Sequence, residues 1–107
     1  MNATKRAKLE ALGYRVTDTQ EFLGLSDEEM ALIDMKIRLV GKLRRTRAER
    51  GLTQAQLAKL IQSSQSRVAM MERGRPEVSL DLVCRALFAM GVSRRQIGQT
   101  IASTRAA

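Results

Sequence analysis

The chain has 107 residues with a formal net charge of +8, and 44% of them are hydrophobic but only 3% aromatic. This length suits one domain with an appended segment, and the shortage of aromatic residues favours an all-α fold over a β-fold. With no His and one Cys, the chain cannot form an internal disulfide and lacks the usual residues for a nitrogen–sulfur metal site or a thiol nucleophile.

Residues 1–25 are predicted to be an N-terminal extension, and residues 26–107 a helical domain. The extension contains a weak helical pattern over residues 4–12, a helix stop at Gly13 and the stretch YRVT, which is able to pair as a strand. Its basic start lacks the apolar run of a secretion signal, and no apolar run in the chain reaches the length of a membrane span. We therefore expect a cytoplasmic protein without a membrane partner.

A strong helix start stands at Ser26, because Ser26 and Glu29 have the spacing of a capping box and acidic residues fill the first turn. An apolar stripe then follows at helical spacing, formed by Met30, Ile33, Ile37 and Val40 and widened by Leu32, Leu39 and Leu43. The pattern predicts one long helix to about Arg50, ended by Gly51, with Gly41 as a point where it could bend or break.

Four shorter helices are predicted after Gly51, each opened by a Ser or Thr cap. They cover residues 53–61, 64–72, 79–90 and 94–102, with caps at Thr53, Ser64, Ser79 and Ser93. The residues expected to face inward are Leu57, Ala58, Ile61, Val68, Met71, Leu82, Val83, Ala86, Leu87, Met90, Ile97 and Ile101. Cys84 lies within the apolar pattern of the third of these helices, so we expect a small core residue there.

Charge is distributed unevenly along the chain. Residues 16–35 contain six acidic and no basic residues, whereas residues 36–107 contain fifteen basic and four acidic residues. A positive field of this strength attracts polyanions, nucleic acid first among them. A merely solvated cationic surface is the simpler alternative. The acidic segment would be repelled by phosphate, so we expect it to point away from any bound nucleic acid.

The stretch Leu52–Arg75 reads as two short helices joined at the polar tetrad SSQS, which is a helix-turn-helix pattern. Ala58 is small where the second helix would cross the first. Gln65, Ser66, Arg67 and Met70 would face outward, where a helix in a major groove meets base edges. Residues from about Ile37 to Met90, and above all "RAERGLTQAQLA" and "SQSRVAMMERG", resemble the Cro/repressor (Xre) family of helix-turn-helix regulators.

The resemblance implies a lambda-repressor-like bundle of about five helices that binds double-stranded DNA. It implies base contacts from Gln65, Ser66, Arg67 and Met70, in which Gln suits adenine and Met a thymine methyl group. The phosphate contacts it implies come from Gln54, Ser64, Arg73 and Arg75. It also implies a partly buried ion pair between Arg47 and Glu72.

The sequence departs from the family at the turn between these two helices. Gln62 stands where the family often has Gly, and positive φ is unfavourable for a residue with a side chain. We therefore expect a looser turn.

The arrangement of an acidic segment, "EFLGLSDEEMALIDMKIRL", before the DNA-binding module resembles small HigA-like antitoxins of toxin–antitoxin pairs. That resemblance implies a toxin partner and repression of the protein's own operon; a plain Xre-type repressor is the other interpretation. A homodimer on a palindromic operator fits either interpretation. Its interface would be formed by Ile97 and Ile101, or by the upstream apolar stripe and FLGL. The simpler alternative is that Ile97 and Ile101 close the core of one chain.

No constellation of residues indicates an enzyme, and no cofactor or metal is expected. The chain lacks His, a phosphate-binding glycine loop and, apart from the helix start at Ser26, carboxylates clustered on one face. The rival to a sequence-specific regulator is a helical protein-interaction module that has only nonspecific affinity for DNA.

Overall fold

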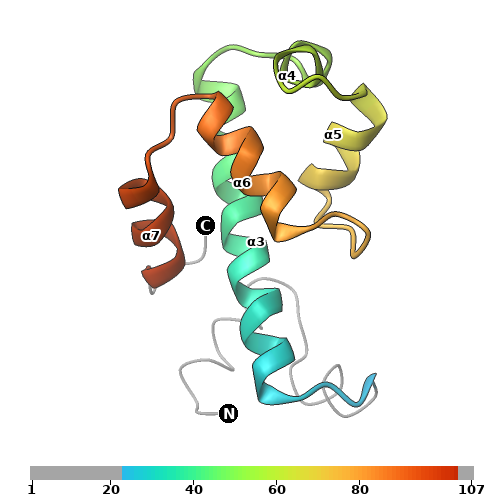
Figure 1. Cartoon of the computed structure of the whole chain (residues 1–107), viewed down its shortest axis with the longest axis vertical. Coiled ribbons are helices and arrows are strands. Elements are labelled where there is room, and N and C mark those ends of the chain that lie inside the picture. The colour runs from blue at the N-terminus through green and yellow to red at the C-terminus, as the bar shows by residue number, and fades with distance from the viewer. Residues whose placement is uncertain (1–22, 104–107) are drawn as a thin grey trace.

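The computed structural model describes residues 23–103, and this part of the chain consists of five α-helices without a β-strand (Figure 1). The helices are α3 (Asp27–Glu49), α4 (Gln54–Leu60), α5 (Gln65–Glu72), α6 (Leu80–Ala89) and α7 (Arg94–Ala102). The predicted all-α class is confirmed. The weak helix expected at residues 4–12 and the strand-like YRVT stretch lie outside the described residues.

Every helix begins at the Ser or Thr that the sequence pattern indicates: Ser26, Thr53, Ser64, Ser79 and Ser93. At Ser26 the hydroxyl accepts from the Glu29 N–H at 3.1 Å, and the Glu29 carboxylate accepts from the Ser26 N–H at 3.2 Å. Two further capping boxes use Gln in place of Glu, at Thr53 with Gln56 and at Ser93 with Gln96. Each cap satisfies N–H groups that a helix start leaves open, which fixes where the helix begins.

The long helix α3 organises the domain, since α5, α6 and α7 all contact it, while α4 packs on α5 (Figure 1). It runs unbroken for 23 residues, so the break that was possible at Gly41 does not occur. Gly41 is buried in the packed half of α3. Packing against neighbouring helices therefore maintains the helix through a residue of low helix propensity.

A single core joins the C-terminal half of α3 to the other four helices. Its buried members are Leu39, Val40, Leu43, Leu57, Ala58, Val68, Met71, Val78, Val83, Ala86, Leu87, Met90, Val92 and Ile97. Val78 and Val92, in the loops on either side of α6, were absent from the expected core. Ile97 is buried and Ile101 packs against this core, so both residues close the core of one chain.

The N-terminal half of α3 extends beyond the helices that bury its other half (Figure 1). Met30 is fully buried there in a small separate cluster with Leu25 and Ile33. Leu32 was expected on the buried flank of the stripe, but 57% of its surface is exposed. The apolar stripe continues along α3, whereas the other helices cover mainly its C-terminal half.

The turn between α4 and α5 is tight, in contrast to the expected loosening. Gln62 has φ +55°, and it is the one non-glycine residue with positive φ in the described part of the chain. The Ser63 N–H donates to the Ala58 carbonyl at 2.8 Å and the Gln62 N–H to the Lys59 carbonyl at 3.2 Å. These bonds close the end of α4, and Gln62 adopts the left-handed conformation in place of a glycine.

Replacing Gln62 by Gly is expected to raise the free energy of unfolding by about 0.5–1 kcal/mol, because glycine reaches positive φ without steric cost. Urea unfolding followed by circular dichroism measures this change. Gly51 has φ +67° and open space where a Cβ would stand, so Gly51→Ala should lower stability by about 1 kcal/mol through the backbone alone. Destabilisation by Gln62→Gly would mean that the Gln62 side chain makes a stabilising contact.

Candidate nucleic-acid interface

The helix pair α4–α5 presents the first turn of α5 to solvent. The Ser64 hydroxyl caps α5 by accepting from the Arg67 N–H at 3.1 Å. The N–H groups of Gln65 and Ser66, at the first two helical positions, lie at the positive end of the helix dipole. Gln65, Ser66 and Arg67 are all exposed, and their side chains make no hydrogen bond or ion pair within residues 23–103. The start of α5 therefore offers donors and acceptors to an external ligand.

Met70 differs from its three neighbours in the predicted base-contacting set. It is partly buried and packs against the main core, so it does not project freely outward as expected. Met70 lies between the exposed face and the buried face that carries Val68 and Met71. Only part of its thioether side chain is available to a ligand.

An ion pair ties the end of α3 to the end of α5. The Arg47 guanidinium donates through Nε to Oε2 of Glu72 and through Nη2 to Oε1 at 3.0 Å, the bidentate geometry that Arg favours with carboxylates. Arg47 is 23% exposed and Glu72 6%. The hydrogen bond to Glu72 raises the pKa of Arg47 above its ordinary value. The expected pairing of these two residues is present.

This ion pair has two further partners, which sequence reasoning missed. Nη1 of Arg47 donates to the Leu52 carbonyl at 2.9 Å, and Nε2 of Gln54 donates to Oε1 of Glu72 at 3.2 Å. Four segments of the helix-turn-helix region therefore meet at one carboxylate–guanidinium pair. The bond from Gln54 depends on how α4 packs on α5, whereas the bond to Leu52 is local and closes the loop that follows α3.

The other residues with predicted phosphate contacts are exposed but differ in their surroundings. Ser64, Arg73 and Arg75 are all accessible to solvent. Arg75 pairs with Glu77 at 3.4 Å, and both side chains are more than half exposed, so water screens this pair and leaves Arg75 able to rearrange. Arg75 also holds Lys36, whose ammonium donates to the Arg75 carbonyl at 2.6 Å. That bond ties the segment after α5 to α3.

Exposed cations surround the helix-turn-helix region. They include Arg44 and Arg45 near the end of α3, Lys59 on α4, Arg67 on α5 and Arg73 just after it. The exposed acidic residues nearest to them in sequence are Glu49 and Glu77, since Glu72 is buried in its ion pair. The resulting positive field favours a polyanionic ligand.

Other kinds of site find little support in the described residues. Residues 23–103 contain no group of three or more potential metal ligands, and none of their helices is long and apolar enough to cross a membrane. Cys84 packs against the core, and burial together with the charge of Asp81 raises the pKa of its thiol. A raised pKa lowers the thiolate fraction that nucleophilic chemistry requires.

Comparison with known proteins gives one match. A family model described as a helix-turn-helix domain matches residues 38–99, which is more than half of the chain. No curated protein and no solved structure matches.

Proposed function

The chain belongs to the helix-turn-helix domain family, a class of DNA-binding regulators, and on this basis we propose that it is a sequence-specific transcriptional repressor without catalytic activity. The observation that carries the proposal is the start of α5, where Gln65, Ser66 and Arg67 are exposed and their side chains have no hydrogen-bond or ion-pair partner among the described residues. In a helix-turn-helix, this end of the second helix meets base edges in the major groove.

Each of these residues has a matching chemistry on DNA. The Gln65 amide is able to pair bidentately with adenine, and Arg67 with guanine or with a phosphate. Ser66 is able to donate or accept, and the exposed part of Met70 would contact a thymine methyl group. Phosphate contacts are proposed for Gln54, Ser64, Arg73 and Arg75, which would fix the register of α5 in the groove.

The repressor is proposed to act as a homodimer on a palindromic operator, because one helix-turn-helix contacts only a half-site. The first experiment is a mobility shift with the DNA directly upstream of the protein's own gene, at physiological salt with excess competitor. A discrete, competitor-resistant complex would support the proposal. A smear that vanishes with competitor would favour the rival function, an interaction module with nonspecific DNA affinity.

Replacing Gln65 by Ala is expected to weaken operator binding by about 1–3 kcal/mol and to leave nonspecific binding nearly unchanged, because only base readout is lost. Titration of labelled operator and of labelled unrelated DNA measures both quantities. Gln99→Ala is the control, since Gln99 is exposed on α7, away from the helix-turn-helix. Equal losses on both DNAs would remove Gln65 from the set of base contacts.

A second role is favoured by the acidic start of α3, which DNA binding does not explain. We propose that the repressor is also the antitoxin of a toxin–antitoxin pair and regulates its own operon. The acidic end of α3 lies far from α4 along the long axis of the molecule (Figure 1), so a protein bound there would leave the DNA-binding side free. Co-purification with the product of the adjacent gene, and relief by this chain of that product's growth inhibition, test the role.

A further inference from the structure

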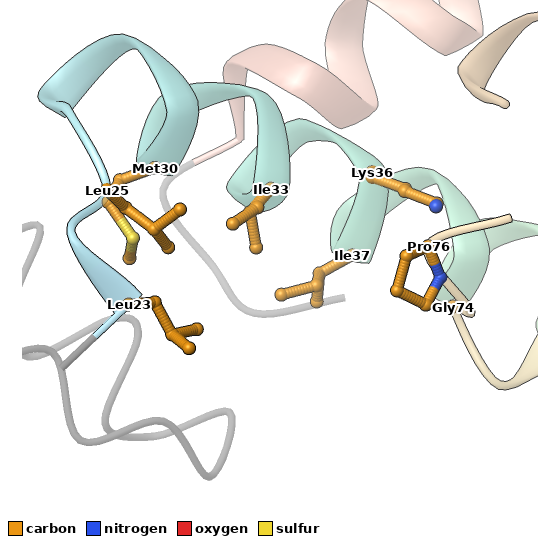
Figure 2. A pocket seen from close by; sticks show the side chains of 8 residues that line it. All are labelled: Leu23, Leu25, Met30, Ile33, Lys36, Ile37, Gly74 and Pro76. Atoms are coloured by element: carbon orange, nitrogen blue, oxygen red, sulfur yellow. The ribbon is translucent and has the colours of Figure 1, made fainter. Parts of the chain in front are cut away.

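An apolar pocket lies along the N-terminal half of α3 and reaches the segment after α5, where its lining residues Gly74 and Pro76 flank Arg75. It has a volume of about 240 Å³, and its lining comprises Leu23, Leu25, Met30, Ile33, Lys36, Ile37, Gly74 and Pro76. Figure 2 shows Ile33 and Ile37 projecting from α3 on the side where Leu23 and Pro76 also lie. Met30 forms the floor, since it is fully buried.

The surface around this pocket is more apolar than a solvated helix end requires. Leu23 and Leu32 are 59% and 57% exposed, and they are two of the four large exposed hydrophobic residues in the described part of the chain. Ile33 and Ile37 are only partly buried. An apolar patch that combines exposed side chains with a pocket is typical of a surface that binds another protein.

The same end of α3 is strongly acidic. Residues 23–35 contain four acidic residues and no basic residue. Of these, Asp34 pairs with Arg38 at 3.1 Å, and the other three stand in the first turn. Glu29 lies one turn before Ile33, and its carboxylate accepts from the Ser26 N–H at 3.2 Å in the capping box while it keeps its negative charge. The acidic first turn of α3 therefore stands about one helical turn before Ile33.

One cation, Lys36, belongs to the lining of the pocket. The Lys36 ammonium lines the end of the pocket next to Gly74 and Pro76 (Figure 2), where it is held by the Arg75 carbonyl at 2.6 Å. Arg75 itself faces Glu77. The acidic first turn of α3 thus lies toward one end of the pocket, and the positive charge of Lys36 lies at the other end.

We propose that this pocket, together with the acidic first turn of α3, is the docking site for a basic amphipathic helix of a partner protein. An apolar side chain of the partner enters between Ile33 and Ile37, and Lys or Arg residues beside it face the first turn of α3. The pairing of an apolar stripe with complementary charge is how a helix is recognised in a groove. The inference rests on the proposed antitoxin role, because it specifies the chemistry of that role's protein partner.

The probe is a fluorescein-labelled helical peptide of about 15 residues, with Leu along one face and Lys or Arg elsewhere. Two control peptides have the same composition in scrambled order, or Glu in place of the basic residues. The full-length protein carries a charge of +8, so a basic peptide is repelled overall and binds only where a local acidic and apolar site exists. Fluorescence anisotropy is expected to show saturable binding of the first peptide alone.

Two variants with matched controls locate the site. Ile33→Ser should weaken peptide binding about tenfold through lost apolar contact, while Leu60→Ser, at a half-exposed leucine of α4, should not. Glu29→Gln keeps a residue type that completes capping boxes elsewhere in this chain and removes the charge. It should weaken binding a few-fold at low salt and less at high salt, while Glu49→Gln at the other end of α3 should not.

Equal binding of the amphipathic and scrambled peptides, or unchanged binding by Ile33→Ser, would overturn the proposal. So would a dimer in sedimentation that Ile33→Ser converts to monomer, since a second copy would then occupy the pocket. The mobility shift with operator DNA is run on the same variants and reports the repressor function separately. If the adjacent gene product still co-purifies with Ile33→Ser at wild-type yield, the antitoxin role stands and the docking site is wrong.

Discussion

Replacing Glu72 by Ala is expected to lower the free energy of unfolding by about 2–3 kcal/mol, because it leaves the Arg47 guanidinium partly buried without its carboxylate. Glu72 is 6% exposed and accepts from both Arg47 and Gln54. The side chain of Arg47 is 23% exposed, so water compensates part of the loss and the effect stays below that of a fully buried pair. Urea unfolding at neutral pH measures the change.

The matched control is Glu77→Ala, which removes the carboxylate of an exposed Arg–Glu pair. It should change stability by less than about 0.5 kcal/mol. Glu72→Gln keeps the shape of the side chain and one accepting oxygen but removes the negative charge. Comparing its stability with that of Glu72→Ala therefore separates the contribution of the charge from that of the side-chain shape. An unchanged unfolding midpoint for Glu72→Ala would mean that the Arg47–Glu72–Gln54 network adds nothing to stability.

The loss of a core leucine is expected to be larger still. Leu87→Ala should cost about 2–5 kcal/mol, because Leu87 is fully buried on α6 and its truncation leaves a cavity as well as removing apolar contact. In a domain of this size, much of the total stability would be lost. Thermal and urea unfolding followed by circular dichroism measure the effect.

The same substitution at an exposed position provides the control. Leu60 is 50% exposed on α4, so Leu60→Ala should cost less than about 1 kcal/mol. Similar losses at positions 60 and 87 would contradict the placement of α6 in the core.

Where each helix begins was predictable because capping is local. Ser26, Thr53, Ser64, Ser79 and Ser93 each bond to an N–H three residues ahead, and such a bond requires only neighbouring residues. The exposure of the start of α5 was predictable for a related reason. Polar residues there precede the apolar positions Val68 and Met71, which fix the buried face of the helix.

Burial along α3 was not predictable, because it depends on which helices lie alongside. Leu32 and Leu39 both belong to the apolar pattern, yet Leu39 is fully buried and Leu32 is 57% exposed. Arg38 lies in a charge-rich stretch and is nonetheless fully buried, with Asp34 as an ion-pair partner. Periodicity gives the face that a residue occupies but not what covers it.

The amino-acid order alone was enough to establish the helical class, the five capped helix starts and the polar first turn of α5, since these follow from hydrogen bonds and periodicity over a few residues. Helix packing was needed to establish the half-buried position of Met70 and the bond from Gln54 to Glu72. The pocket beside Ile33 arises in the same way. Each of these features depends on segments that are separate in the chain, and the distances between them are fixed only when the helices pack together.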